Sequence, residues 1–394
     1  MSNGNPKLNS FLVAITLLCA ALLIGEYSLL KRIDQVEDTL STRLHRLNRL
    51  AANYEEYRAL RVVPPGKRDV LYPAQKTFRP GVDTLSAFQA RLRTDLRRWI
   101  GLDEERLGRP VTKRVIETQT LDSLGVVREQ VEVAFEGNDS WYLRGYLLYP
   151  LNAAGSLPGV LCLNGHSGRA RAVAGLDEDY SHAYGLGLAQ AGCKVLTFDW
   201  CFEGDSHLAD DNGKLYSAHD SLFSYVEKTG RTGLALYMEN AYCALKALRQ
   251  EPQVDAGRLG VTGISRGGEL TTYFAALFAP EIAAYYASGA GFPFVYRAFG
   301  GGCQCTYVED IFANYEFSDL MIAAAPLPAK LQLGVKDDIW GYWDNIELIL
   351  TSVRPVYGAL GATNLVGLDI HQDEHVYNVP LSVAFFKKYL IDKD

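Results

Sequence analysis

The chain has 394 residues, of which 48% are hydrophobic and 22% charged, and its formal net charge is −7 at pH 7. This length suffices for one large core with an appendage. The acidic balance and the lack of a basic stripe in the sequence argue against nucleic acid as a partner.

Cysteine usage indicates buried thiols. The seven cysteines are odd in number and lie mostly in apolar runs, which argues against a disulfide framework. Cys303 and Cys305 are close enough to form half of a metal site, but no second ligand pair with a recognisable spacing accompanies them. We therefore expect no bound metal.

Residues 1–30 are predicted to form an uncleaved signal-anchor. Residues 11–24 (FLVAITLLCAALLI) carry no charge and, with their flanks, are just long enough to span a bilayer as a helix. A cleaved secretory signal is the main alternative, and a soluble helix is a third. We expect a single-pass membrane protein with its main domain outside the cytoplasm. Lys7 on one side and Lys31-Arg32 on the other are competing signals for the cytoplasmic side.

Residues 31–64 are predicted to form a charged helical stalk that ends at Pro64-Pro65-Gly66. Apolar residues approximate an a/d heptad, as in a short coiled coil through which two chains could associate. The alternative is a single amphipathic helix on the globular domain. The heptad positions are Ile33, Val36, Leu40, Leu47, Leu50, Tyr54 and Tyr57.

Residues 65–394 show the pattern of an α/β domain. An amphipathic helix (84–102) precedes three alternating strands with short connections, which predicts an antiparallel lead-in sheet. Short apolar strands then alternate with helices, as in a parallel sheet with crossover helices. The predicted strands are 111–118, 126–135, 141–149, 159–163, 193–198, 258–262, 282–288, 330–334 and 364–370. The predicted helices after them are 181–191, 234–249, 269–278, 346–360 and 381–391.

A G-x-S-x-G pattern, Gly263-Ile264-Ser265-Arg266-Gly267, lies between a predicted strand and a predicted helix. This context predicts a nucleophile elbow, in which a strained tight turn exposes the Ser265 hydroxyl at the edge of the sheet. The glycines are expected because side chains at those positions would collide across the turn.

An elbow serine needs a base and a carboxylate that orients it, in the chain order Ser, Asp or Glu, His. Asp337 follows the next-to-last strand three residues past Gly334, and Asp338 is the alternative. His375 lies between the last strand and the terminal helix, and His371 is the alternative.

The oxyanion hole is predicted to use two backbone N–H groups. One belongs to Arg266, directly after the nucleophile, at a helix N-terminus. The other lies in the glycine-rich segment 163–168 (LNGHSG), at His166 or Ser167. A glycine-rich turn without a role is the alternative for this segment.

Aromatic residues after Asp337 are candidates for the substrate pocket, with core packing as the alternative. They are Trp340, Tyr342 and Trp343, which could stack on a sugar. The chemistry needs neither a metal nor an organic cofactor.

From about residue 83 to the C-terminus the chain resembles α/β-hydrolases of the acetyl xylan esterase, dienelactone hydrolase and prolyl-oligopeptidase-like group. The resemblance implies an α/β-hydrolase fold, with a mostly parallel sheet and helices on both faces, and hydrolysis of small or carbohydrate acyl esters. Two departures are Trp340-Gly341 in place of a frequent proline, and Glu374 in place of the usual glycine before the histidine. The matching segments are LCLNGHSG, FDWCFEGDS with Asp199 and Gly204, GISRGG, CQCTYVEDI, GVKDDIW and DEHVYN.

Two other functions are weighed against an esterase. A serine peptidase of this group usually carries an N-terminal propeller, which about 100 residues cannot form. A non-catalytic, membrane-tethered binding protein would typically have lost one of the three catalytic candidates.

Overall fold

The computed structural model of the chain describes residues 74–137, 141–166, 168–206, 226, 228–294, 304–337 and 343–392. All of them belong to one compact unit, Asp69–Asp394. The predicted anchor (1–30) and stalk (31–64) lie outside the described residues. Within those residues, every helix is too short or too polar to cross a membrane.

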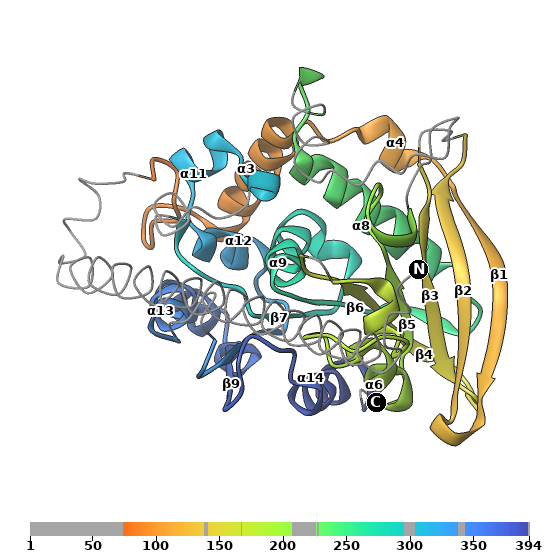
Figure 1. Cartoon of the computed structure of the whole chain (residues 1–394). Helices are drawn as coiled ribbons and strands as arrows, with labels where there is room; N and C mark the ends of the chain where they lie inside the picture. Colours follow the sequence, from red (N-terminus) through yellow and green to blue (C-terminus); the bar gives the residue numbers. More distant parts are fainter. Residues whose placement is uncertain are drawn as a thin grey trace, which may run out of the picture. The chain divides into compact units, whose positions relative to one another are not determined.

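In the described part of the chain, a nine-stranded sheet has the order β1-β2-β3-β5-β4-β6-β7-β8-β9 (Figure 1). The pairs β1–β2, β2–β3 and β3–β5 are antiparallel, and the remaining pairs are parallel. The antiparallel lead-in and the parallel sheet are thus confirmed. The strands are β1 Val111–Leu121, β2 Val126–Phe135, β3 Leu143–Pro150, β4 Leu157–Leu163, β5 Lys194–Phe198, β6 Val254–Ile264, β7 Ala284–Ser288, β8 Ala329–Gly334 and β9 Val366–His371.

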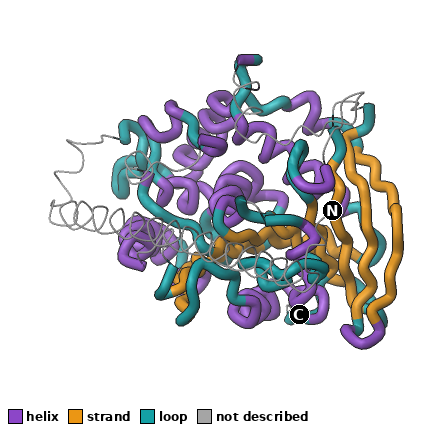
Figure 2. The backbone as a smooth tube through the Cα atoms, viewed as in Figure 1, coloured by secondary structure: helices purple, strands orange, loops and turns teal. Residues whose placement is uncertain are grey.

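Helices cover both faces of the sheet (Figures 1 and 2). Strand β4 is buried along its whole length, and its side chains alternate between two apolar clusters. Leu161 and Leu163 belong to the larger cluster, whereas Val160 and Cys162 belong to the smaller one. The larger cluster includes residues of α3 Leu85–Ile100, α8 Gly233–Arg249, α9 Arg266–Phe278, α12 Phe317–Ala324 and α13 Trp343–Ala359. The smaller one includes residues of α5 Ala170–Val173, α6 Tyr184–Gln190 and α14 Val379–Phe386.

The lead-in helix α3 is an integral part of this unit. It buries apolar residues at a spacing of four, Phe88, Leu92, Leu96 and Ile100, so one stripe of the helix faces the core. Gly101 ends the helix at φ 74°, and its N–H donates to carbonyls of the last turn. Helix α4, Glu104–Gly108, follows directly.

The structure differs from the predicted elements at a few places. Helix α6 begins at Tyr184 rather than at residue 181, because His182 and Ala183 have φ values of 50° and 52° and cannot continue a right-handed helix. Helices α11 (Glu309–Asn314) and α12 were not predicted. Helix α12 has only eight residues and is almost wholly buried, so its sequence lacks the polar face that marks an amphipathic helix.

Strand β1 forms one edge of the sheet, and within the described residues it pairs with β2 alone. Most of its residues are exposed, including Val115 and Ile116. A register shift interrupts its pairing between Val115 and Glu117.

Candidate active site

Ser265 lies in the turn between β6 and α9, where its backbone has φ 59° and ψ −124°. A non-glycine residue in this region costs roughly 1–3 kcal/mol and persists only where its surroundings enforce it. Here the Ser265 N–H donates to the carbonyl of Ser288 on β7 at 2.9 Å. The strand–turn–helix context predicted for the G-x-S-x-G pattern is therefore present.

The glycines around Ser265 allow three chain segments to meet. A Cβ atom at Gly263 would lie 2.5 Å from the carbonyl oxygens of Gly267 and Leu163, and one at Gly267 would collide with the Leu163 carbonyl. These contacts confirm the expected steric conflict across the turn. They also extend it to the end of β4, which a sequence pattern alone does not indicate.

His375 and Asp337 form a close pair, with 2.6 Å between His375 Nδ1 and Asp337 Oδ2. The side chains are 9% and 1% exposed, respectively, so the contact is shielded from water. Gly334 makes this possible because a Cβ atom there would collide with the carbonyl oxygens of Asp373 and Glu374. Asp338, the alternative acid, lies outside the described residues.

His371, the alternative base, is the last residue of β9 and is buried. Its Nδ1 lies 3.4 Å from the Asp373 carboxylate. Burial lowers the pKa of His371, which favours a neutral ring. The structure thus brings His375, and not His371, into hydrogen-bond contact with Asp337.

The His375 ring lies against the strand that supports the nucleophile. A Cβ atom at Gly289 would be 2.7 Å from His375 Cε1, and Gly289 directly follows Ser288, the partner of the Ser265 N–H. His375 Nε2 is buried and has no hydrogen-bond partner among the described residues. The nitrogen opposite the Asp337 contact is therefore left for a further group.

Residues 372–378, here called the histidine loop, are held by neutral side chains. The Gln332 amide on β8 accepts from the Asn378 N–H at 2.9 Å and donates to the Asn378 carbonyl at 3.0 Å. Gln332 also accepts from the Ser288 hydroxyl at 2.6 Å. The Tyr377 N–H donates to the Tyr180 carbonyl at 2.8 Å. The loop that carries His375 is thus tied to the strand next to the nucleophile.

The segment after β4, residues 164–166 and 168–169, is here called the oxyanion loop. A Cβ atom at Gly165 would lie 2.7 Å from the Ile264 carbonyl and 3.0 Å from Ser265 Cβ, so the loop runs directly against the nucleophile turn. The Tyr180 hydroxyl donates to the His166 carbonyl at 2.6 Å. The Tyr180 ring also lies 5.9 Å from the His375 ring, centroid to centroid. Tyr180 therefore contacts both loops.

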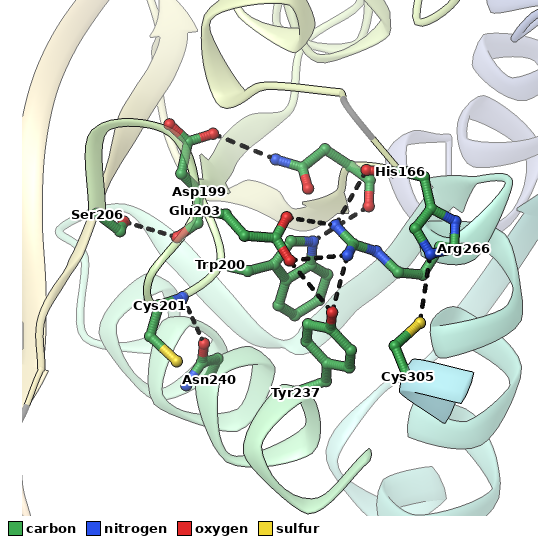
Figure 3. Close-up of polar contacts among 12 residues, drawn as sticks. His166, Asp199, Trp200, Cys201, Glu203, Ser206, Tyr237, Asn240, Arg266 and Cys305 are labelled. Atoms are coloured by element: carbon green, nitrogen blue, oxygen red, sulfur yellow. Dashed lines mark hydrogen bonds and ion pairs between the residues drawn. The ribbon is translucent and has the colours of Figure 1, made fainter. Parts of the chain in front are cut away.

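Asp199, just after β5, supports the oxyanion loop from the other side (Figure 3). Its carboxylate accepts from the N–H groups of Ala170 and Asp205, each at 2.7 Å, and from the Asn164 amide at 3.4 Å. Burial raises the pKa of Asp199 to about 6. Gly204 has φ 51°, and a Cβ atom there would collide with this carboxylate. This close approach explains why the FDWCFEGDS segment has an aspartate at 199 and a glycine at 204.

The predicted pocket aromatics are not placed: Trp340 and Tyr342 lie outside the described residues, and of Trp343 only the backbone, at the start of α13, is described.

Within the described ranges, no three metal-ligating side chains come together. Five of the seven cysteines are described, and all five are buried, as expected. Cys305 Sγ lies 3.3 Å from His166 Nε2. Cys19 and Cys303 are outside the described residues.

Three side chains near the site had no signal of their own in the sequence. They are Tyr180, Glu203 and Gln332, each a single residue without a motif, and the partners His166, Arg266 and Asn378 lie 14, 63 and 46 positions away in the chain. Only Glu203 lies in one of the segments that resemble the α/β-hydrolase group, FDWCFEGDS.

Searches of family models and of curated proteins find no match to the chain. Solved structures do match. A putative acetyl xylan esterase from Bacteroides fragilis NCTC 9343 is 18% identical with a TM-score of 0.61, over 75% of this chain and 78% of that one. A methylesterase is 19% identical with a TM-score of 0.61, over 79% of this chain and 65% of that one. A glucuronoyl esterase from Solibacter usitatus is 17% identical with a TM-score of 0.60, over 80% of this chain and 97% of that one.

These identities are low, so the likeness defines the architecture. The chain has the α/β-hydrolase fold, with a mixed, mostly parallel sheet, as the resemblance in its sequence implied.

Proposed function

We propose that the protein is a serine carboxylic-ester hydrolase that works through an acyl-enzyme. The observation that carries this proposal is the placement of Ser265 in a strained turn beside a buried His375–Asp337 pair. All three residues follow the carboxyl ends of parallel strands, β6, β9 and β8, where the loops of an open α/β sheet form its sites.

In this mechanism Ser265 Oγ attacks the ester carbonyl while His375 Nε2 accepts the hydroxyl proton. Asp337 fixes the His375 ring through Nδ1 and stabilises the imidazolium. The proton then passes to the departing alcohol as the C–O bond breaks. Water, activated by the same histidine, attacks the acyl-enzyme and releases the carboxylic acid and free Ser265.

The negative charge of each tetrahedral intermediate needs fixed donors. We assign these to the backbone N–H of Arg266, at the first position of α9, and to that of His166 in the oxyanion loop. The N-terminus of α9 adds a favourable partial positive charge at this point.

Carbohydrate or small acyl esters are the proposed substrates. The support is that the similar structures are named as an acetyl xylan esterase, a methylesterase and a glucuronoyl esterase. A serine peptidase and a non-catalytic binding protein remain the rival functions.

The test is an activity screen of the full chain and its Ser265→Ala variant. The panel holds p-nitrophenyl acetate, acetylated xylo-oligosaccharides, uronic acid methyl esters and peptides. Wild type should hydrolyse at least one ester, and Ser265→Ala should lower kcat by on the order of 10⁶-fold. A serine-directed fluorophosphonate should label Ser265 once per chain. Peptide cleavage without ester cleavage would favour the peptidase, and tight sugar binding without turnover or labelling would favour the binding protein.

A further inference from the structure

The Arg266 side chain is buried beneath the nucleophile turn and is 1% exposed. Its Nη1 and Nη2 donate to the two carboxylate oxygens of Glu203 at 2.8 and 2.7 Å. Nη1 also donates to the Tyr237 hydroxyl at 2.8 Å, and Nη2 to the Gly165 carbonyl at 3.1 Å. Figure 3 shows Glu203 and Tyr237 converging on this guanidinium.

The Arg266–Gly165 hydrogen bond is important because its two residues are chain neighbours of the nucleophile and of a proposed oxyanion donor. Arg266 directly follows Ser265, and Gly165 directly precedes His166. The guanidinium therefore joins the two segments that supply the proposed oxyanion donors. The side chain of one donor residue holds the loop of the other.

The charge of the guanidinium is matched by the cluster around it. Burial alone would lower the pKa of Arg266, but Tyr237 and Glu203 raise it, so the group stays charged. Its carbon Cζ lies 5.0 Å from the centre of the Tyr237 ring and 5.7 Å from that of Trp200. A planar guanidinium with both ends engaged has one orientation here, which a lysine ammonium cannot reproduce.

The oxyanion loop is also fixed on its other sides. Trp200 Nε1 donates to the Asn164 carbonyl at 3.2 Å, and the His166 ring contacts Cys305. The Tyr180 hydroxyl donates to the His166 carbonyl. Of these contacts, the Arg266–Gly165 bond is the one that runs directly to the nucleophile turn.

We propose that Arg266, oriented by Glu203, is a positioning residue that sets the spacing of the two oxyanion donors around Ser265. This inference rests on the proposed esterase function. It assigns the guanidinium no contact with substrate: the group acts through the Gly165 carbonyl and the backbone that follows it.

If the Arg266–Glu203 pair were only structural, its loss would lower stability and leave kcat per titrated site unchanged. Another carboxylate of the chain, Glu239, provides the control. Glu239 on α8 is fully buried and bonds to Arg106 and Arg231 and to the Asp103 N–H. These partners are remote in the chain from Ser265 and from the oxyanion loop. Glu239→Gln therefore removes a carboxylate that also pairs with arginine, although Glu239 is fully buried and the Glu203 side chain is 22% exposed, and it leaves the proposed donors untouched.

The experiment compares Arg266→Lys, Glu203→Gln and Glu239→Gln in the full chain, with p-nitrophenyl acetate as substrate. Active sites are titrated with a fluorophosphonate, so that kcat refers to competent sites only. Affinity for phenylboronic acid reports the oxyanion hole, because the boronate adduct on serine is tetrahedral and anionic. Arg266→Lys and Glu203→Gln should lower kcat per site by about 10- to 100-fold, as a displacement near 1 Å does. Boronate affinity should fall in parallel while KM stays nearly constant, since the lost interaction is made in the transition state.

Glu239→Gln should lower the melting temperature and leave kcat per titrated site unchanged. Tyr237→Phe removes a single hydroxyl from the Arg266 cluster and should give a smaller loss of kcat, which keeps the test available if Arg266→Lys does not fold. Wild-type kcat per site and boronate affinity in Arg266→Lys or Glu203→Gln would overturn the positioning role. Absence of ester turnover and of labelling in wild type would instead overturn the esterase proposal on which it rests.

Discussion

Apart from the His375–Asp337 pair, the histidine loop is held by neutral groups, whereas the oxyanion loop is held by buried charges. On the first side, the amide of Gln332 bonds to both backbone groups of Asn378. On the second, Arg266 and Asp199 are both almost fully buried and both bond to the loop or its flank.

This difference affects how each side fails. A neutral hydrogen bond contributes about 1 kcal/mol net, so its loss weakens a loop by degrees. Removing one member of a buried ion pair leaves the other charge without compensation and costs about 3–5 kcal/mol. Loss of a single contact should therefore cost more stability on the oxyanion side than on the histidine side. The stability contributed by the oxyanion side should also depend more strongly on pH.

The largest effect on kcat is expected from substitutions in the His375–Asp337 pair. Asp337→Asn should lower kcat by about 10⁴-fold, because an amide favours the wrong tautomer of the His375 ring, and His375→Ala should cost at least as much. Steady-state kinetics on the preferred ester would measure both. Under the same assay, Asp338→Asn and His371→Ala should cost far less, and the reverse ranking within either pair would move the role to the neighbour.

A smaller effect is expected from displacing the histidine loop without touching its polar groups. In Gly334→Ala the new methyl group meets the backbone carbonyls of Asp373 and Glu374, so the loop must shift. We expect kcat to fall by roughly 10²- to 10³-fold, as a displacement of about 1 Å gives 10²-fold. Gly358→Ala is the matched control, since its Cβ atom meets nothing closer than 3.7 Å. It should leave kcat unchanged and raise stability by up to about 1 kcal/mol. Equal kinetics in the two variants would mean that the close approach at Gly334 does not position His375.

The smallest effect concerns the pH dependence of stability on the oxyanion side. The pKa of Asp199 is about 6 in the folded chain against an ordinary 3.8, so between these values the folded state binds more protons than the unfolded state. Stability contributed by this group therefore falls as pH rises from about 4 to 6, by at most on the order of 3 kcal/mol. Asp199→Asn cannot titrate, so its stability deficit relative to wild type should shrink between pH 4 and pH 7.

Urea denaturation at four pH values would measure that difference. Asp177→Asn serves as its control, because the surface pair with Arg171 lowers the pKa of Asp177 and places its titration below this window. A constant deficit for Asp199→Asn across the range would mean that Asp199 is already ionised at pH 4.

Local patterns predicted the elements that carry the site, while tertiary contacts decided the rest. The G-x-S-x-G turn, the acid after β8 and the histidine before α14 each have a signature within about ten residues. Glu203 and Arg266 are 63 positions apart, and Gln332 and Asn378 are 46 apart, so no local pattern pairs them. The start of α6 was mispredicted because two left-handed residues, His182 and Ala183, carry no sequence mark.

The edge strand β1 has a consequence for how the molecule behaves at high concentration. An eleven-residue strand at the margin of a sheet presents a template onto which another chain can add. Here Lys113, Arg114 and Glu117 place charge along it, and the irregular pairing next to Val115 bends its outer margin. Both features oppose the addition of a second strand. Among the described residues, β1 thus combines a long exposed margin, where Val115 and Ile116 are 44% and 43% exposed, with features that oppose ordered aggregation.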